Sequence, residues 1–218
     1  KNILTIEDPV EYRLDGVNQV QVKAAIGLTF AQGLRSFLRQ DPDVIMVGEI
    51  RDLETAEISI QASLAGRLVF STVHTSNAPT AVTRLIDLGI PPFLLSSTLS
   101  LIVAQRLPRR LCQDCRQPYE PLPALREQFH ITEDLLYRAK GCEPCNNTGY
   151  RGRIGVYEVM SLDRELLDLV TKNTPSHVLK EAAVKSGLVT LWQSGLKKVR
   201  AGITSLEELA NVVVFDRV

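Results

Sequence analysis

The chain has 218 residues, of which 44% are hydrophobic and 23% charged, as in an ordinary globular protein. Lys plus Arg and Asp plus Glu number 25 each, so no overall electrostatic field attracts nucleic acid or an acidic membrane. The longest apolar run, at 93–104, is interrupted by serine and threonine and is too short to span a bilayer.

The first part of the chain alternates short apolar runs with helical patterns, which predicts an α/β fold with a parallel sheet. Strands are predicted at 1–6, 44–47 and 68–72, the last two as buried strands. The alternating segment 17–22 follows the turn signal Asp15-Gly16 and is predicted to be a half-buried hairpin strand.

Helices are predicted between these strands and in the last third of the chain. Thr29 is the expected N-cap of a helix over 30–39, and Asp52 that of a helix ended by Gly66. After Pro91-Pro92 the pattern becomes helical, and a short strand is expected at 154–159. Further helices are predicted at 164–172, 176–186, 191–201 and 205–214, the last opened by a capping box of Ser205 and Glu208.

Polar side chains follow three of the predicted strands, at the point where each strand ends. Glu7 and Asp8 follow the first strand, Glu49 the second and His74 the third. Ligands of open α/β sheets bind at the carboxyl edge of the strands, and a carboxylate there can meet a hydrated Mg²⁺ beside a nucleotide phosphate. The alternative is a set of core strands followed by solvated turns, which packing alone would produce. The repetition over three strands favours the functional interpretation.

Individual residues of this edge have alternatives of their own. His74 can sense a terminal phosphate or serve as a structural hydrogen-bonding group. Arg51 can neutralise phosphate or pair with Asp52 or Glu54, and the local pair is the favoured reading. Asp43, at the start of its strand, is too far from the carboxyl edge to share the site.

Four cysteines form two Cys-x-x-Cys pairs, Cys112 with Cys115 and Cys142 with Cys145. Two such knuckles supply the four thiolates of a closed tetrahedral zinc site, which is structural because it has no open coordination position. Two disulfides or free thiols are the alternatives. The segment between the knuckles is predicted to carry a helix at 133–140.

A basic cluster lies beside the first knuckle, and it comprises Arg106, Arg109, Arg110 and Arg116. Its functional interpretation is a contact with nucleic acid or with a neighbouring subunit's phosphate, and its alternative is a solvated surface. No Gly-x-x-x-x-Gly-Lys-[Ser/Thr] loop occurs in the chain, although a phosphate-handling enzyme of this kind needs one.

Together these motifs resemble the secretion ATPase superfamily of type II secretion and type IV pilus assembly. The segment 6–11 is similar to its acidic Asp box, 38–52 to its Walker B motif and 66–77 to its His box. The resemblance covers the whole chain and begins just after the family's Walker A loop, so we expect the C-terminal part of a larger ATPase that is inactive alone. Paired Cys-x-x-Cys knuckles resemble the assembly and secretion branch.

The resemblance implies a RecA-like α/β core and a role for each matching residue. It implies Glu7 as catalytic base, Glu49 as the Walker B carboxylate that reaches Mg²⁺ through water, and His74 as phosphate-state sensor. Asp8, Glu11 and Arg51 are further candidates near the ATP and Mg²⁺. The family commonly has a second histidine where this chain has Arg67, which leaves that position without an assigned role.

The family works as a homo-hexamer on the cytoplasmic face of the inner membrane. Its partners there are a membrane platform protein and a cytoplasmic recruiting partner. We therefore expect a truncated ATPase core at 1–107, a zinc subdomain at 108–153 and a helical part at 154–218. The rival hypothesis is a zinc-stapled module that binds nucleic acid or protein, and the zero net charge argues against nucleic acid.

Overall fold

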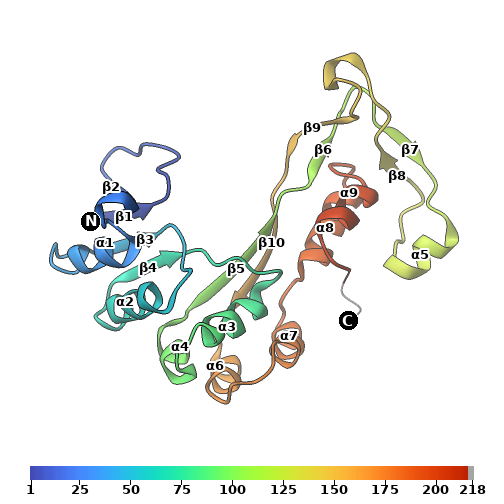
Figure 1. The fold of residues 1–218 in the computed structure, drawn as a ribbon. Coiled ribbons are helices and arrows are strands. Elements are labelled where there is room, and N and C mark those ends of the chain that lie inside the picture. Colours follow the sequence, from blue (N-terminus) through green and yellow to red (C-terminus); the bar gives the residue numbers. More distant parts are fainter. Residues whose placement is uncertain (216–218) are drawn as a thin grey trace. The chain divides into compact units, whose positions relative to one another are not determined.

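The computed structural model describes residues 1–215, and the chain forms two compact units. The first comprises residues 1–102 and 161–182, and the second comprises 103–160 and the residues from 183 onward (Figure 1). Within residues 1–215 no helix has both the length and the hydropathy needed to cross a membrane.

The first unit is built on a four-stranded sheet with the order β2-β1-β3-β4. All neighbouring strands run parallel, as the α/β pattern predicts. The strands are β1 (Ile3–Glu7), β2 (Asn18–Gln21), β3 (Val44–Val47) and β4 (Leu68–Ser71). The predicted strands at 1–6 and 44–47 are confirmed.

The predicted hairpin at 17–22 is wrong in direction, because β2 pairs with β1 in parallel. The intervening residues return along the sheet to its starting edge, and the side chain of Gln19 holds them there. Its Nε2 donates to the Tyr12 carbonyl at 2.9 Å, and its Oε1 accepts from the Leu14 amide at 2.7 Å. A turn dipeptide alone does not distinguish such a return from a hairpin.

Two helices bury one face of this sheet: α1 (Phe30–Phe37), which is amphipathic, and α2 (Leu53–Leu64). Thr29 caps α1 by accepting from the Gln32 amide, and Asp52 caps α2 by accepting from the Thr55 amide, as predicted. The shared core is apolar and includes Leu4, Ile6, Leu34, Phe37, Ile45, Val47 and Ile58. This core fixes the strand ends that carry the polar residues.

The prediction of a buried strand at 68–72 is wrong in its burial, because β4 lies at the edge of the sheet. Val69 packs against the core, whereas Leu68 and Phe70 are 55% and 54% exposed. Successive side chains of a strand alternate between faces, so these two project from the opposite face. An uninterrupted apolar run does not reveal which strand has only one neighbour.

The rest of the first unit is helical. Sequence reasoning did not predict α3 (Ala78–Asp87), which begins with a reciprocal capping box between Asn77 and Thr80. The others are α4 (Pro92–Thr98), α6 (Arg164–Thr171) and α7 (Ser176–Lys185), and α4 packs against α6. The helices predicted at 164–172 and 176–186 are confirmed.

The second unit contains three strand pairs. They are β5 (Leu101–Arg106) with β10 (Val156–Ser161), β6 (Arg109–Leu111) with β9 (Tyr150–Arg153), and β7 (Gln117–Tyr119) with β8 (Leu136–Arg138). The helical pattern expected after Pro92 therefore stops at α4 and gives way to a strand.

Helices complete the second unit: α5 (Pro123–Phe129), α8 (Leu191–Arg200) and α9 (Leu206–Val212). The helix predicted at 133–140 is wrong, because the helix lies earlier, at α5, and residues 136–138 form β8. Leu136 is fully buried there and Tyr137 packs under the guanidinium of Arg116. These tertiary contacts override the local helix propensity of the segment.

Candidate functional site

Backbone hydrogen bonds bring the ends of three strands together at the carboxyl edge of the first unit's sheet. The Gly48 amide donates to the Ile6 carbonyl at 2.8 Å, directly beyond the β1–β3 pairing. The Thr72 hydroxyl donates to the Gly48 carbonyl at 2.6 Å, and the Ile50 amide donates to the Thr72 carbonyl at 3.0 Å. These bonds hold the polar residues that follow β1, β3 and β4 at one edge.

At Gly48 the chain that follows β3 passes close to the backbone at the end of β1. A Cβ built there lies 3.3 Å from the Cα of Glu7 and 3.3 Å from the Ile6 carbonyl oxygen, both backbone atoms. A side chain would therefore separate the two strand ends by a few tenths of an ångström. The glycine lets the residues after β1 and β3 lie side by side.

Glu49 lies at the centre of the edge, and its side chain is only 12% exposed. Its Oε2 lies 2.6 Å from Nε of Arg51 and 3.3 Å from Nε2 of His74. The Arg51 guanidinium lowers the pKa of the Glu49 carboxyl against the opposing effect of burial, and His74 lowers it further. The carboxylate is thus held in its charged form.

The expected pairing of Arg51 with Asp52 or Glu54 is wrong, because Arg51 pairs with Glu49 instead. The alternatives have other partners. Asp52 caps α2 through the Thr55 amide, and Glu54 pairs with Arg35 of α1.

Glu7 is held in place by two hydrogen bonds to its Oε1. The Thr5 hydroxyl donates at 2.6 Å and Nε2 of Gln19 donates at 3.0 Å. Glu7 and Glu49 both line a cavity of about 330 Å³ that also includes Asp8, Glu11 and Thr72. The four predicted acidic residues therefore surround one space, and His74 and Arg51 reach it through Glu49.

The donor set of this cavity suits a hydrated magnesium ion. Mg²⁺ is held in proteins by one or two carboxylates, while its other positions keep water or bind phosphate. Oε2 of Glu49 is buried and, apart from its two ion-pair contacts, accepts no hydrogen bond of good geometry from any described residue. A charged carboxylate at this edge can accept a hydrogen bond from an ion-bound water.

Two other residues lie away from this edge. Asp43 precedes β3 and accepts from the Asn2 amide at 2.6 Å, at the opposite end of the strand, as expected. Arg67 precedes β4, where its guanidinium donates to the Ala65 carbonyl at 3.1 Å and lies 3.9 Å from Asp41. A direct role for Arg67 at the acidic cavity has no support in these contacts.

The second unit brings the four cysteines together. The sulfur atoms of Cys112, Cys115, Cys142 and Cys145 all lie within 4.8 Å of one another. Cys112 and Cys142 are 3.8 Å apart, Cys115 and Cys145 are 3.9 Å apart, and Cys142 and Cys145 are 3.6 Å apart. Four thiolates about 2.3 Å from one zinc ion lie about 3.8 Å apart, so the sulfur positions fit a tetrahedral metal site.

The surroundings of Cys145 favour the thiolate that a metal needs. The amides of Cys142 and Gly149 each lie 3.2 Å from its sulfur. Burial raises the pKa of the Cys145 thiol, but these amides and the neighbouring thiols outweigh it and lower the pKa to about 6, whereas burial and the neighbouring thiols raise the pKa of Cys142 to about 12. All four cysteines are free, so the disulfide alternative is wrong. The four cysteines are positioned to bind a metal.

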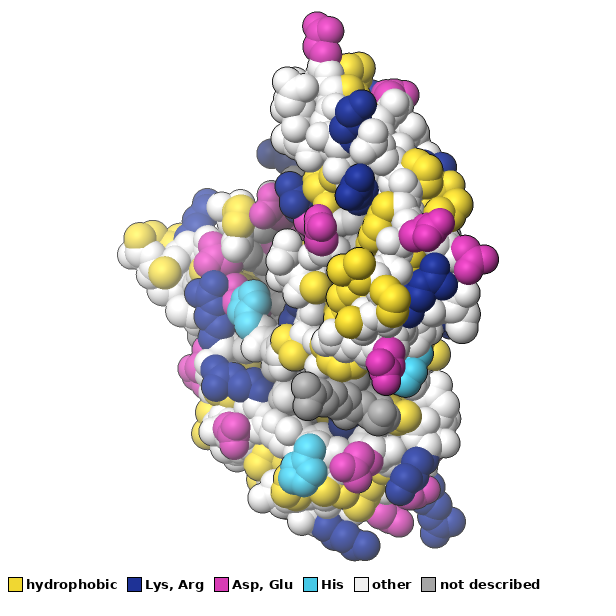
Figure 2. Space-filling view, turned by 90° about the vertical axis from the view of Figure 1, so that its right-hand side faces the viewer, with side chains coloured by type: hydrophobic (Ala, Val, Ile, Leu, Met, Phe, Trp, Pro, Cys, Tyr) yellow, Lys and Arg dark blue, Asp and Glu magenta, His cyan; other side chains and the backbone are white. Residues whose placement is uncertain are grey.

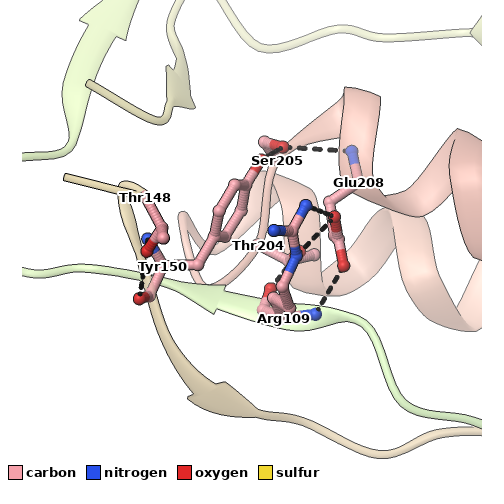
Figure 3. A network of polar contacts seen from close by, with 6 residues as sticks. All are labelled: Arg109, Thr148, Tyr150, Thr204, Ser205 and Glu208. Carbon is pink, nitrogen blue, oxygen red and sulfur yellow. Dashed lines mark hydrogen bonds and ion pairs between the residues drawn. The ribbon is translucent and has the colours of Figure 1, made fainter. Parts of the chain in front are cut away.

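The arginines beside the first knuckle make internal contacts. Both guanidinium contacts of Arg109 reach one carboxylate oxygen of Glu208, at 3.0 and 2.6 Å (Figure 3). Arg116 donates to the Gly202 carbonyl at 2.6 Å. Figure 2 shows acidic and basic side chains interspersed over the face it draws. Arg109 and Arg116 are therefore engaged in contacts within the second unit.

Glu208 is the residue in this region whose role sequence reasoning assigned incorrectly. Ser205 caps α9 by accepting from the Glu208 amide, but the Glu208 side chain turns to Arg109 and leaves the capping box half formed. The burial of Glu208, whose side chain is 5% exposed, has no local sequence signal.

Comparison with known proteins agrees with the geometry. The family described as "Type II/IV secretion system protein" matches residues 1–211. The "Type II secretion system ATPase E" of Vibrio cholerae serotype O1 is 51% identical, over 97% of this chain and 42% of that protein. The "Type IV pilus assembly ATPase PilB" of Myxococcus xanthus is 48% identical, over 99% of this chain and 39% of that protein.

Solved structures give the same answer for the fold. The pilus retraction motor PilT with bound ADP aligns with a TM-score of 0.69 and 28% identity, over 96% of this chain and 52% of that one. The chain spans about two fifths of the length of the curated relatives it matches. By its match over residues 1–211, the chain belongs to the type II/IV secretion system protein family.

Proposed function

We propose that this chain is the C-terminal ATPase part of a motor that hydrolyses ATP to assemble pilin-like subunits in type II protein secretion. The observation that carries the proposal lies at the carboxyl edge of the parallel sheet. Glu49 contacts His74 there, and Glu49 and Glu7 line the same acidic cavity. Relatives named as ATPases of secretion and pilus assembly support it.

In this proposal each residue of the edge has a distinct task. Glu49 binds a water ligand of Mg²⁺, and Glu7 deprotonates or orients the attacking water. His74 donates to the terminal phosphate and reports its loss through Glu49. Asp8 and Glu11 add negative charge around the ion, and Arg51 holds Glu49 in its charged form. The phosphate-binding loop comes from residues outside this sequence, so these 218 residues alone hydrolyse no ATP.

The larger assembly is a further part of this proposal, and the family membership supports it. We infer a RecA-like core that works as a homo-hexamer on the cytoplasmic face of the inner membrane. There it engages a membrane platform protein and a cytoplasmic recruiting partner. The division into an ATPase core at 1–107, a metal subdomain at 108–153 and a helical part at 154–218 stays a prediction.

The four cysteines hold a structural zinc ion in this proposal. Their sulfur spacing fits tetrahedral coordination, and all four positions are filled by thiolates. The ion would fix the geometry of the two knuckles and leave no open position for chemistry.

The test uses the longer protein that also carries the phosphate-binding loop. Mg²⁺-ATP turnover is measured for Glu7→Gln, Glu49→Gln and the control Glu57→Gln, whose residue is exposed on α2. Loss of a positioned acid or base typically costs about 100-fold or more. We expect that loss in the first two variants and wild-type turnover in the control. Wild-type turnover in both Glu7→Gln and Glu49→Gln would contradict the assignment.

Type IV pilus assembly is the second candidate, because the PilB relative is nearly as similar as the secretion ATPase. Deletion of the gene in its native host separates the two. Loss of exoprotein release with intact surface pili supports secretion, and loss of pili with intact release supports pilus assembly.

A further inference from the structure

Four residues near the two cysteine knuckles contact one short segment, which links α8 to α9 and includes the first residues of α9. We define this segment, 202–208, as the latch segment. It contains Gly202, Thr204, Ser205 and Glu208 and lies far from both knuckles in sequence.

The strand before the first knuckle makes the most extensive contact. The Leu111 amide, directly before Cys112, donates to the Ile203 carbonyl at 2.8 Å. Arg109 donates to Glu208 from its backbone amide at 2.9 Å as well as from its guanidinium, and its carbonyl accepts from the Thr204 hydroxyl at 2.8 Å (Figure 3). Arg109 and Leu111 therefore both contact the latch segment, Leu111 through its main chain and Arg109 through its main chain and its side chain.

Residues that follow each knuckle also contact the latch segment. Arg116, directly after Cys115, donates to the Gly202 carbonyl and stacks over Tyr137 of β8 at 4.4 Å. Tyr150, the first residue of β9, comes after the second knuckle in the chain. Its hydroxyl forms a 2.7 Å hydrogen bond with the hydroxyl of Ser205 (Figure 3). Its ring also lies 4.2 Å from the Arg109 guanidinium.

The two knuckles themselves are joined by the main chain. The Cys112 amide donates to the Gly149 carbonyl at 2.9 Å, which aligns β6 with β9. The positions of Arg109, Arg116 and Tyr150 are therefore fixed by the relative position of the knuckles. A metal ion bound to all four sulfur atoms would tie the two knuckles together, because each knuckle supplies two of its ligands.

We propose that the tetracysteine site is a metal-controlled latch, which docks α9 and the end of α8 through Arg109, Arg116 and Tyr150. The inference rests on the proposed metal site and goes beyond it, because a merely local staple would leave the C-terminal helices in place when the metal is removed. Loss of metal releases the latch segment, and the first unit keeps its structure.

The test is hydrogen exchange on the full 218-residue chain, with Zn²⁺ as the only added metal and zinc content measured in parallel. We expect removal of zinc by a chelator to speed amide exchange in 202–212 at least tenfold, whereas amides of α2 keep their rates. Restoring Zn²⁺ should restore the protection. A chain that loses its zinc but keeps full protection of 202–212 would overturn the latch.

A variant separates the latch from the metal site. Glu208→Gln keeps the size of the side chain but removes the charge that pairs with Arg109. We expect it to bind zinc as wild type does and to exchange faster in 202–212, whereas Arg151→Gln on the exposed face of β9 changes neither. Unchanged exchange in Glu208→Gln would also overturn the proposal. A wild-type chain that binds no zinc would refute the metal site itself, and the latch with it.

Discussion

Nε2 of His74 lies 3.3 Å from Oε2 of Glu49, although the two residues belong to the loops after different strands. The contact exists because β3 and β4 pair in parallel with Val47 opposite Ser71, so both strands end at the same level. His74 is 88% exposed and Glu49 only 12%, so the histidine approaches the buried carboxylate from solvent. It is placed to respond to what occupies the acidic cavity.

His74→Ala in the longer protein should lower ATP turnover about tenfold, because one hydrogen bond to a charged group contributes about 1.5–3 kcal/mol. ATP affinity should fall less than turnover, since the phosphate-binding loop supplies the other contacts with the phosphates. Steady-state turnover and nucleotide binding measured together check this. His177→Ala on α7 is the control and should match wild type. Equal turnover in both variants would count against a role for His74.

Arg51→Ala should raise the pKa of the Glu49 carboxyl towards its ordinary value, because Arg51 is the main cause of its lowering. A carboxyl whose folded-state pKa is lowered adds stability above its unfolded pKa and loses it as pH falls through the folded pKa. Wild type should therefore be more stable than the variant near neutral pH, and the difference should vanish in acid. Carboxyl NMR titration and urea unfolding at several pH values check this, and a difference independent of pH would contradict it.

Ile45→Ala should destabilise the first unit by about 2–5 kcal/mol, because Ile45 is fully buried on a central strand. Leu68→Ala is the matched control on the edge strand. Its side chain is 55% exposed, so we expect a loss of less than about 1 kcal/mol. Urea unfolding checks both, and similar losses in the two variants would contradict the placement of β4 at the edge.

Cys142→Ser should abolish stoichiometric zinc binding, because it removes one of four thiolates from a closed site. Wild type should retain about one equivalent after dialysis, measured by elemental analysis. Less than about half an equivalent in wild type would contradict the zinc assignment. Ser97→Ala, an exposed position of α4, should leave the zinc content unchanged.

Local signals predicted most of the fold. Thr29 and Asp52 marked helix starts correctly because a cap is decided by residues three positions away. The helix α3 was missed although its cap is local, whereas two other failures depend on distant partners. β8 replaced a predicted helix because Leu136 is buried beside β7, and β4 is exposed because it has one neighbouring strand.

At the candidate site, too, local patterns predicted the positions of residues, but contacts between distant residues could not be predicted. Glu7, Glu49 and His74 were predicted from their positions after strands, since parallel strands end at a common edge. The pairing of Arg51 with Glu49 was missed, because several acidic residues lie near Arg51 in the sequence. In the structure Asp52 caps α2 and Glu54 pairs with Arg35, and Arg51 pairs with Glu49. The contact between Arg109 and Glu208 joins residues far apart in the chain, and no local pattern encodes it.

The most direct test of the account measures ATP binding and ATP hydrolysis side by side in Glu49→Gln of the longer protein. Glutamine keeps the shape of Glu49 but cannot hold a water of Mg²⁺ through negative charge. We predict that the variant binds ATP within about threefold of wild type and that its turnover falls about 100-fold or more. Turnover equal to that of wild type, with binding intact, would contradict the central claim that the carboxyl edge of this sheet is a site of ATP hydrolysis.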